Sequence, residues 1–117
     1  MQDVFEKEKV EIWSNKPKRD FIFTEDAADA VLKILDTDFT GIVNLGSGKM
    51  SSLKLISEII EDLSGKKIIS KNQPVSGPME FNTNIKRISE VTGWEPKFDI
   101  EKGLEKTFKI MKSYYSK

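Results

Sequence analysis

The chain has 117 residues, of which 38% are hydrophobic and 32% charged, which suits one folded domain with a modest core. Its 19 basic and 19 acidic residues cancel, so it lacks the net positive field that gathers nucleic acid or anionic membrane. With no cysteine and no histidine, disulfides, thiolate nucleophiles and the commonest general base and metal ligand are excluded. No apolar run approaches the roughly 18–20 residues that cross a bilayer. Residues 1–10 lack the apolar centre of a signal peptide, so we expect a cytoplasmic protein.

Two short strands are the first elements that the sequence predicts with a clear pattern. Residues 10–13, Val-Glu-Ile-Trp, alternate in polarity, and residues 20–23, Asp-Phe-Ile-Phe, follow a loop that contains Pro17. Two such runs around a turn predict strands that pair with each other. Residues 3–9, which precede them, are polar and are consistent with the end of a helix.

A helix and a strand are predicted next. Thr24 is a candidate helix cap, and two carboxylates follow in the first turn, where they complement the helix dipole. Helical spacing gives this helix one apolar face, formed by Ala28, Val31, Leu32 and Leu35. Residues 41–46, Gly-Ile-Val-Asn-Leu-Gly, predict a buried strand, and a tight turn follows it at residues 46–48.

The second half predicts three helices and one strand. Ser51 or Ser52 caps a helix that Gly65 ends, and residues 67–70 form a short strand. Asn84 caps a short helix that stops at Gly93. A last helix, capped by Asp99, has an apolar face formed by Leu104, Phe108, Met111 and Tyr115. Strands therefore alternate with helices, which predicts an α/β fold over one domain, residues 1–117.

Two motifs favour structural over chemical interpretations. Gly46-x-Gly48 lies between a predicted strand and a predicted helix, as a phosphate-binding loop does. Ser51 stands where a dinucleotide-binding fingerprint has its third glycine, and Met50 follows Lys49 where a Walker A loop has Ser or Thr. A tight turn is the favoured interpretation. The acidic residues at the predicted helix start could be an acid/base pair, but their position explains them without catalysis; they are Glu25, Asp26 and Asp29.

Basic and aromatic residues supply the other candidates for a site. Arg19 ends the basic run at residues 16–19, and its planar fork suits a phosphate, although Asp20 could neutralise it. Trp13 and Trp94 could each stack on a base or a sugar. Packing in a core is the favoured role for Trp94, whereas Trp13 borders a loop and both roles stay open.

Four segments together resemble extended short-chain dehydrogenases/reductases that act on nucleotide-sugars. They are residues 19–28 (Arg-Asp-Phe-Ile-Phe-Thr-Glu-Asp-Ala-Ala), residues 41–48 followed by Ser52-Leu53, residues 93–96 (Gly-Trp-Glu-Pro) and Gly103-Leu104. The order and spacing of these segments resemble the C-terminal, substrate-binding portion of such enzymes. The resemblance implies an α/β portion with short strands and about four helices, without the Rossmann coenzyme domain.

The resemblance also implies a site. Arg19 would contact a phosphate of a nucleoside diphosphate sugar, and Ile12 and Trp13 would line the nucleobase pocket. Many members have a second phosphate-binding arginine where this chain has residues 74–80, which contain none, so Lys71 or Arg87 would have to replace it. In the family, the Rossmann domain holds NAD(P) and the catalytic Tyr-x-x-x-Lys group. This sequence contains neither the glycine-rich coenzyme loop of that domain nor the Tyr-x-x-x-Lys group. We therefore expect no catalytic residue and no cofactor here, and NAD(P) only in a full-length enzyme.

The function expected from the resemblance is binding of a nucleotide-sugar as part of an NAD(P)-dependent epimerase, dehydratase or reductase, with no catalysis by this chain alone. The alternative is a non-catalytic interaction module or scaffold that pairs with a separate Rossmann chain. In the family, residues 42–45 join the edge of the Rossmann sheet. Without that sheet, a strand edge and apolar surface are left uncovered, which predicts self-association. No nucleic-acid or membrane partner is expected.

Overall fold

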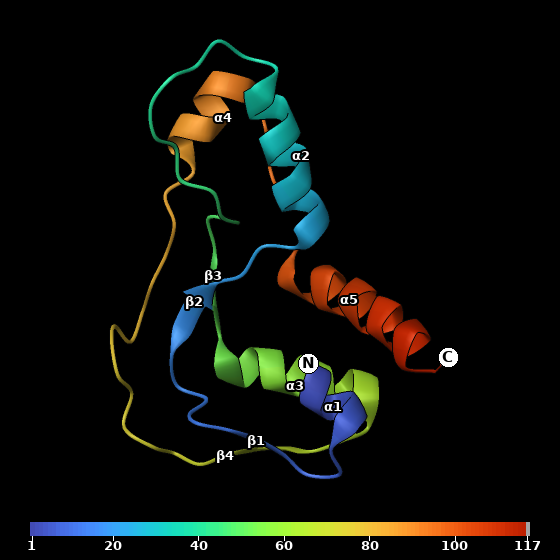
Figure 1. Ribbon diagram of the computed structural model, residues 1–117. Coiled ribbons are helices and arrows are strands. Elements are labelled where there is room, and N and C mark those ends of the chain that lie inside the picture. Colours follow the sequence, from blue (N-terminus) through green and yellow to red (C-terminus); the bar gives the residue numbers. More distant parts are fainter. Residues whose placement is uncertain (117) are drawn as a thin grey trace.

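A computed structural model describes residues 1–116, and its helices and strands alternate as an α/β fold (Figure 1). The helices are α1 (Gln2–Glu6), α2 (Thr24–Leu35), α3 (Leu53–Ser64), α4 (Lys86–Thr92) and α5 (Ile100–Tyr115). The strands are β1 (Val10–Ile12), β2 (Lys18–Asp20), β3 (Met50–Ser52) and β4 (Ile68–Ser70). The predicted fold class is confirmed, and α1 occupies part of the polar stretch before the first strand.

The strands form two separate ladders instead of the predicted pair. β1 runs parallel to β4, with Val10 opposite Ile68, and β2 runs antiparallel to β3, with Lys18 opposite Ser52. The predicted pairing of the first two strands is wrong, and the second strand lies at residues 18–20, not 20–23. An alternating run shows that a segment can be a strand, but a run this short does not specify its partner, which here comes from far along the chain.

Residues 41–46 were predicted to be a buried strand, and this is wrong. The segment forms no strand, and Ile42 is 80% exposed. Within residues 1–116, the one hydrogen bond recorded to it comes from Arg87 Nη1, 2.9 Å from the Ile42 carbonyl oxygen. Apolar composition suits a strand only where a neighbour offers free N–H and C=O groups. The chain supplies no such neighbour between residues 1 and 116.

The buried residues form two small clusters instead of one core. The first joins α1, β1, α3 and α5 through Val4, Val10, Ile60 and Phe108. The second joins α2, α4 and the segment that follows α4 through Ala30, Ile88 and Trp94. Figure 1 shows α2 and α4 at one end of the molecule, α1 and α3 at the other, and α5 beside α3.

The molecule is an open slab, with principal extents of 49 × 38 × 17 Å. Its radius of gyration is 16.3 Å, whereas a compact domain of this length has about 13 Å. The chain therefore buries less of its surface than an independent domain of its size.

Most of the predicted helix ends are confirmed. Ser52 Oγ accepts from the Leu55 N–H at 3.0 Å, and Asp99 Oδ1 accepts from the Lys102 N–H at 2.8 Å. Thr24 is the first helical residue instead of the cap of α2, because Phe23 takes the cap position. Asn84 accepts from the Lys86 N–H but lies one residue before the cap of α4.

The apolar face of α2 is uncovered, as the resemblance implied. Leu32 is 67% exposed and Leu35 is 72% exposed, whereas Ala30, on the opposite side, is fully buried. The helix therefore carries apolar residues on both sides, a pattern typical of a helix that is covered on both sides.

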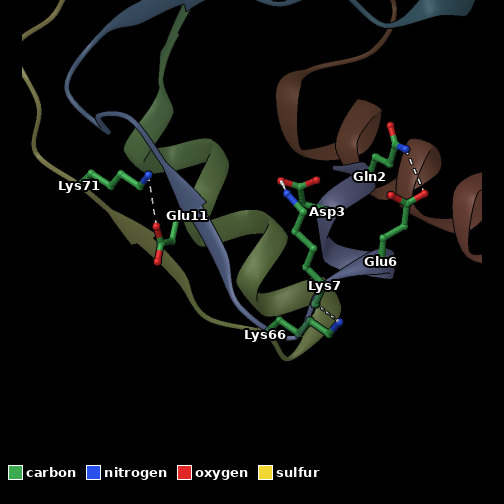
Figure 2. A network of polar contacts seen from close by, with 7 residues as sticks. All are labelled: Gln2, Asp3, Glu6, Lys7, Glu11, Lys66 and Lys71. Carbon is green, nitrogen blue, oxygen red and sulfur yellow. Dashed lines mark hydrogen bonds and ion pairs between the residues drawn. The ribbon is translucent and has the colours of Figure 1, made fainter.

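Figure 2 shows one hydrogen bond that joins the end of α1 to the segment after α3, and two contacts between residues four apart along α1 and its cap. Lys66, just after α3, donates from Nζ to the Lys7 carbonyl oxygen at 2.8 Å, and Lys7 pairs with Asp3 at 3.2 Å. On the other side of α1, Gln2 donates to Glu6 at 3.0 Å. Between residues 1 and 116, no helix is both long and apolar enough to cross a membrane.

Candidate substrate site

A pocket of about 230 Å³ lies where β1 ends and β2 begins. Three segments far apart in the sequence form it: residues 13–19, the start of α3 and the loop after β4. Its lining residues are Trp13, Ser14, Pro17, Arg19, Leu53, Val75 and Ser76. Two of the three residues predicted to bind substrate, Trp13 and Arg19, thus line one cavity.

The indole of Trp13 is held in place while much of it stays exposed. Its Nε1 donates to the Pro74 carbonyl oxygen at 2.9 Å, and its own carbonyl oxygen accepts from the Gln73 N–H at 3.1 Å. The side chain is nevertheless 62% exposed. An aromatic ring fixed by its polar edge suits stacking on a planar base, because little freedom remains to be lost.

Arg19 is anchored by one of its two terminal nitrogens. Nη1 donates to the carbonyl oxygens of Lys18, at 2.9 Å, and Met79, at 3.1 Å. No ion pair of Arg19 is recorded within residues 1–116, so the possible neutralisation by Asp20 does not occur there; the carboxylate of Asp20 accepts from Ser47 and Gly48. Nε and Nη2 make no recorded hydrogen bond inside the described chain and are available to an anion.

Ile12 lies next to this pocket but is not part of its lining. It is the last residue of β1, pairs with Ser70 of β4 and is half-buried. Its carbonyl oxygen accepts from the Lys71 N–H at 2.9 Å, which continues the ladder past β4. The structure therefore brings together Trp13 and Arg19, and Ile12 contributes to the strand that positions Trp13.

The chain is similar to parts of longer known proteins. No family model matches the chain. Over 107 residues the chain is 32% identical to a probable GDP-L-fucose synthase of Oryza sativa subsp. japonica. The matched region is 86% of this chain and 32% of that protein. The chain belongs to the extended short-chain dehydrogenase/reductase (SDR) family. It spans about a third of the length of the curated relatives that it matches.

Solved SDR structures share the fold. The UDP-glucose 4-epimerase of Thermotoga maritima, solved with UDP-glucose, superposes with a TM-score of 0.85 at 21% identity, covering 97% of this chain and 38% of that one. A UDP-glucuronic acid 4-epimerase of Bacillus cereus, solved with NAD and a fluorinated UDP-sugar, gives 0.82 at 21% identity, with 97% and 38% covered. The chain matches the C-terminal portion of these SDR folds.

The glycine turn of this SDR chain is filled by a carboxylate of the chain itself. Asp20 accepts from the Ser47 N–H at 2.8 Å and the Gly48 N–H at 2.9 Å, and also from the Ser47 hydroxyl. These are the amides that a phosphate would require. The structure thus favours the tight-turn interpretation, and Asp20 explains why the turn needs no ligand.

The start of α3 is also closed to anions. The Leu53 N–H donates to the Pro17 carbonyl oxygen and the Lys54 N–H to the Asn15 carbonyl oxygen, both at 2.9 Å. The next N–H, of Leu55, is taken by the Ser52 cap. A phosphate in the pocket would therefore meet the guanidinium of Arg19 and not free N–H groups at the start of α3.

Gly46→Ala tests the turn. A β-carbon at Gly46 would lie 2.7 Å from Asp20 Oδ2 and 2.7 Å from Thr83 Cβ. We expect the free energy of unfolding to fall by about 1–3 kcal/mol, the usual cost of overpacking, measured by urea denaturation. Gly103→Ala is the control, because a β-carbon at Gly103 would lie 3.3 Å from its nearest neighbour, Phe23 Cβ. Equal losses in the two variants would contradict the close packing at Gly46.

A second cationic side chain is missing from the pocket lining in residues 1–116. Lys71 pairs with Glu11 at 3.4 Å (Figure 2), and the ammonium groups of Lys9 and Lys71 lower the pKa of Glu11. Arg87 is bound to the Ile42 carbonyl oxygen and lines a different pocket. Neither residue replaces the second arginine that many SDR members have.

The acidic group at the start of α2 is structural. Asp26 is 2% exposed and accepts from the N–H groups of Lys97 and Phe98, each at 3.0 Å. Glu25 pairs with Lys106 of α5 at 2.8 Å. No group of three or more acidic side chains in residues 1–116 is placed to hold a metal ion. Sequence reasoning missed that Asp26 joins α2 to the segment after Trp94, because the two are 71 and 72 residues apart.

Proposed function

We propose that this chain binds the nucleoside diphosphate part of a nucleotide-sugar, as the substrate-binding portion of an NAD(P)-dependent epimerase, dehydratase or reductase. The observation that supports it best is the shared pocket of Trp13 and Arg19, in which an exposed indole lies together with guanidinium donors that are unpaired within residues 1–116. An aromatic face and a planar cation are what a base joined to a diphosphate requires.

The relatives support the substrate class but leave the base open. The curated relative with 32% identity is named for a GDP-sugar, whereas the two solved structures contain UDP-sugars. The loop of residues 74–76 is the place where base selectivity would arise, because Pro74 fixes the indole edge of Trp13 and the next two residues line the pocket.

Catalysis is assigned to a separate coenzyme-binding portion. The sequence has no histidine, no cysteine and no Tyr-x-x-x-Lys pair, so it offers no hydride-carrier site and no evident proton-transfer group. We expect no conversion when NAD and a nucleotide-sugar are added to the chain alone. Turnover in that assay would overturn this assignment.

Titration with nucleotides tests the proposal directly. Amide-resolved NMR with UDP, GDP, dTDP and CDP, and NAD as a control, should show shifts at Trp13, Arg19 and the loop of residues 74–76 with one diphosphate and none with NAD. No response to any of the diphosphates would overturn the proposal.

Arg19→Ala gives the sharper test. One charge-assisted contact contributes roughly 1.5–3 kcal/mol, so we expect diphosphate affinity to fall about 10- to 150-fold, measured by NMR titration or calorimetry. Arg87→Ala is a matched control, since Arg87 lines another pocket, and it should leave affinity unchanged. Equal losses in both variants would place the phosphate elsewhere.

The second candidate is a non-catalytic interaction module that pairs with a separate Rossmann chain. The observation that favours it is the pocket's single cationic side chain among the described residues, because one arginine binds a diphosphate more weakly than two. Failure to bind any nucleotide, together with tight binding to a coenzyme-binding chain, would favour this candidate over the first.

A further inference from the structure

One residue shortly after β4 has a backbone conformation that is uncommon for its type. Asn72 has a φ of 52°, and among residues 1–116 it is the only residue other than glycine with a positive φ. Asparagine adopts this left-handed region more readily than most residues do, whereas a β-branched residue adopts it only with strain. Asn72 is exposed, so packing in a core does not impose this conformation.

The sequence around Asn72 confines the change of direction to this one position. The Lys71 N–H donates to the Ile12 carbonyl oxygen at 2.9 Å, so Lys71 still continues the ladder of β1 and β4. Pro74 disfavours helical backbone at Gln73 and has its own φ held at about −65°. Residues 73 and 74 therefore form a stiff unit, and Asn72 sets the direction in which that unit leaves β4.

This stiff unit holds Trp13 at two points. The Gln73 N–H donates to the Trp13 carbonyl oxygen at 3.1 Å, and the indole Nε1 donates to the Pro74 carbonyl oxygen at 2.9 Å. The next two residues along the chain, 75 and 76, line the same pocket as the indole. The fixed edge of the indole and one wall of the pocket therefore both depend on the direction taken at Asn72.

Two hydrogen bonds with Ser70, the last residue of β4, stabilise the turn at Asn72. The Asn72 N–H donates to Ser70 Oγ at 3.2 Å, and the Ser70 hydroxyl donates to Asn72 Oδ1 at 3.1 Å. Asparagine and aspartate both have the short side-chain oxygen that this second bond needs and tolerate the left-handed region. Glycine adopts the backbone conformation without the side-chain bond, and valine offers neither.

The opposite end of the loop after β4 is anchored separately. The Lys18 N–H donates to the Met79 carbonyl oxygen at 2.8 Å, and the same oxygen accepts from Arg19 Nη1 at 3.1 Å. These contacts do not involve the residues that hold the indole. A change at Asn72 should therefore displace Trp13 and leave Arg19 in place.

We propose that Asn72 is a positioning residue for the nucleobase in the pocket of Trp13 and Arg19. Its left-handed backbone directs residues 73 and 74 onto Trp13, so the indole is already fixed when a base stacks on it. A ring that is held in advance loses little freedom on binding, which favours affinity. This inference rests on the proposed function, but the effect of Asn72 on the indole is measurable without any nucleotide.

Three substitutions at Asn72 test the proposal by NMR of the chain without ligand. In Asn72→Val, the indole N–H signal of Trp13 should move towards that of a free indole, and its exchange with water should become faster. Asn72→Gly and Asn72→Asp should keep this signal close to its native position. The Nε–H signal of Arg19 should stay native in all three variants. An unchanged Trp13 signal in Asn72→Val would contradict the positioning role.

Titration of the same variants with UDP, GDP, dTDP and CDP gives the second readout. The strain of a β-branched residue in the left-handed region corresponds to about 5- to 30-fold weaker binding by Asn72→Val. Asn72→Gly and Asn72→Asp should restore most of the affinity, because both keep the backbone conformation. Recovery in neither variant would mean that the backbone conformation at this position does not position the base.

Gly93→Ala is the matched control for backbone strain away from the pocket. Gly93 ends α4 with a φ of 74°, and a β-carbon there would meet no atom within 4 Å. The variant therefore introduces strain in the same backbone region without a clash, and it should bind nucleotides as the unmodified chain does. Equal weakening in Gly93→Ala and Asn72→Val would assign the effect to a general loss of stability and count against the proposal.

This inference and the proposed function can fail separately. If the unmodified chain binds none of the four nucleotides, the proposed function fails, and a Trp13 signal that moves in Asn72→Val still supports Asn72 as the residue that holds the indole. If the chain binds a nucleotide and Asn72→Val binds it equally well, the proposed function stands and the positioning role is wrong.

Discussion

Trp94→Ala should lower the free energy of unfolding by about 3–5 kcal/mol, the usual cost of truncating a buried tryptophan. Trp94 is fully buried and, with Ala30 and Ile88, makes up the buried residues of the second cluster. That cluster joins α2 to α4, so the substitution should unfold the part of the molecule formed by these two helices first. Chemical denaturation followed by far-UV circular dichroism gives the free energy, and amide exchange shows which helices are released.

Two control variants separate this effect from the loss of any tryptophan. Trp13→Ala removes a ring that is 62% exposed and should cost less than about 1 kcal/mol. Trp94→Phe keeps most of the buried volume and removes an Nε1 donor that has no hydrogen-bond partner within residues 1–116, so it should be milder than Trp94→Ala. If Trp13→Ala is as destabilising as Trp94→Ala, the second cluster does not stabilise the fold as described.

Asp26→Ala should be the second strongly destabilising change, by roughly 2–4 kcal/mol, because two partly buried backbone N–H groups lose a charged acceptor. The carboxylate bonds the Lys97 and Phe98 amides at 3.0 Å each and is itself 2% exposed. These contacts fix the segment between Trp94 and α5 against the start of α2. Thermal or chemical denaturation measures the loss, and NMR should show the Lys97 and Phe98 amides shifting most.

The neighbouring acid is the control for Asp26. Glu25 pairs with Lys106 at 2.8 Å, but its side chain is 53% exposed, so Glu25→Ala should cost no more than about 1 kcal/mol. Both residues lie in the first turn of α2 and would contribute similarly to the helix dipole. A similar loss in the two variants would mean that the helix dipole, and not the hydrogen bonds to Lys97 and Phe98, explains the effect of Asp26.

Asp20 and Arg19 show how neighbouring charges take separate roles. An ion pair between them, which their adjacency allowed, would have neutralised the candidate phosphate contact. Asp20 instead occupies the glycine turn, and Arg19 is oriented by the carbonyl oxygens of Lys18 and Met79. The side chains of adjacent strand residues point to opposite faces, which explains the separation.

Local chemistry in the sequence determined the helices and their ends. Ser52 and Asp99 cap helices because a short oxygen-bearing side chain there accepts a first-turn N–H, and Gly65 and Gly93 end helices in a left-handed conformation. These interactions join residues a few positions apart, so a local pattern contains them. The alternation of helices with short strands, and with it the α/β class, follows from the same information, whereas β3 at residues 50–52 was not predicted.

The tertiary structure alone decided which strands pair, what is buried and what forms the pocket. The runs around residues 10 and 20 predicted strands but not their partners, β4 and β3, and the apolar residues 41–46 predicted a strand that no neighbour completes. The lining of the pocket combines residues 13–19 with residues 75 and 76, and Asp26 reaches residues 97 and 98. Such contacts depend on how distant segments meet in three dimensions, and the periodicity within one segment does not identify the segment that it will contact.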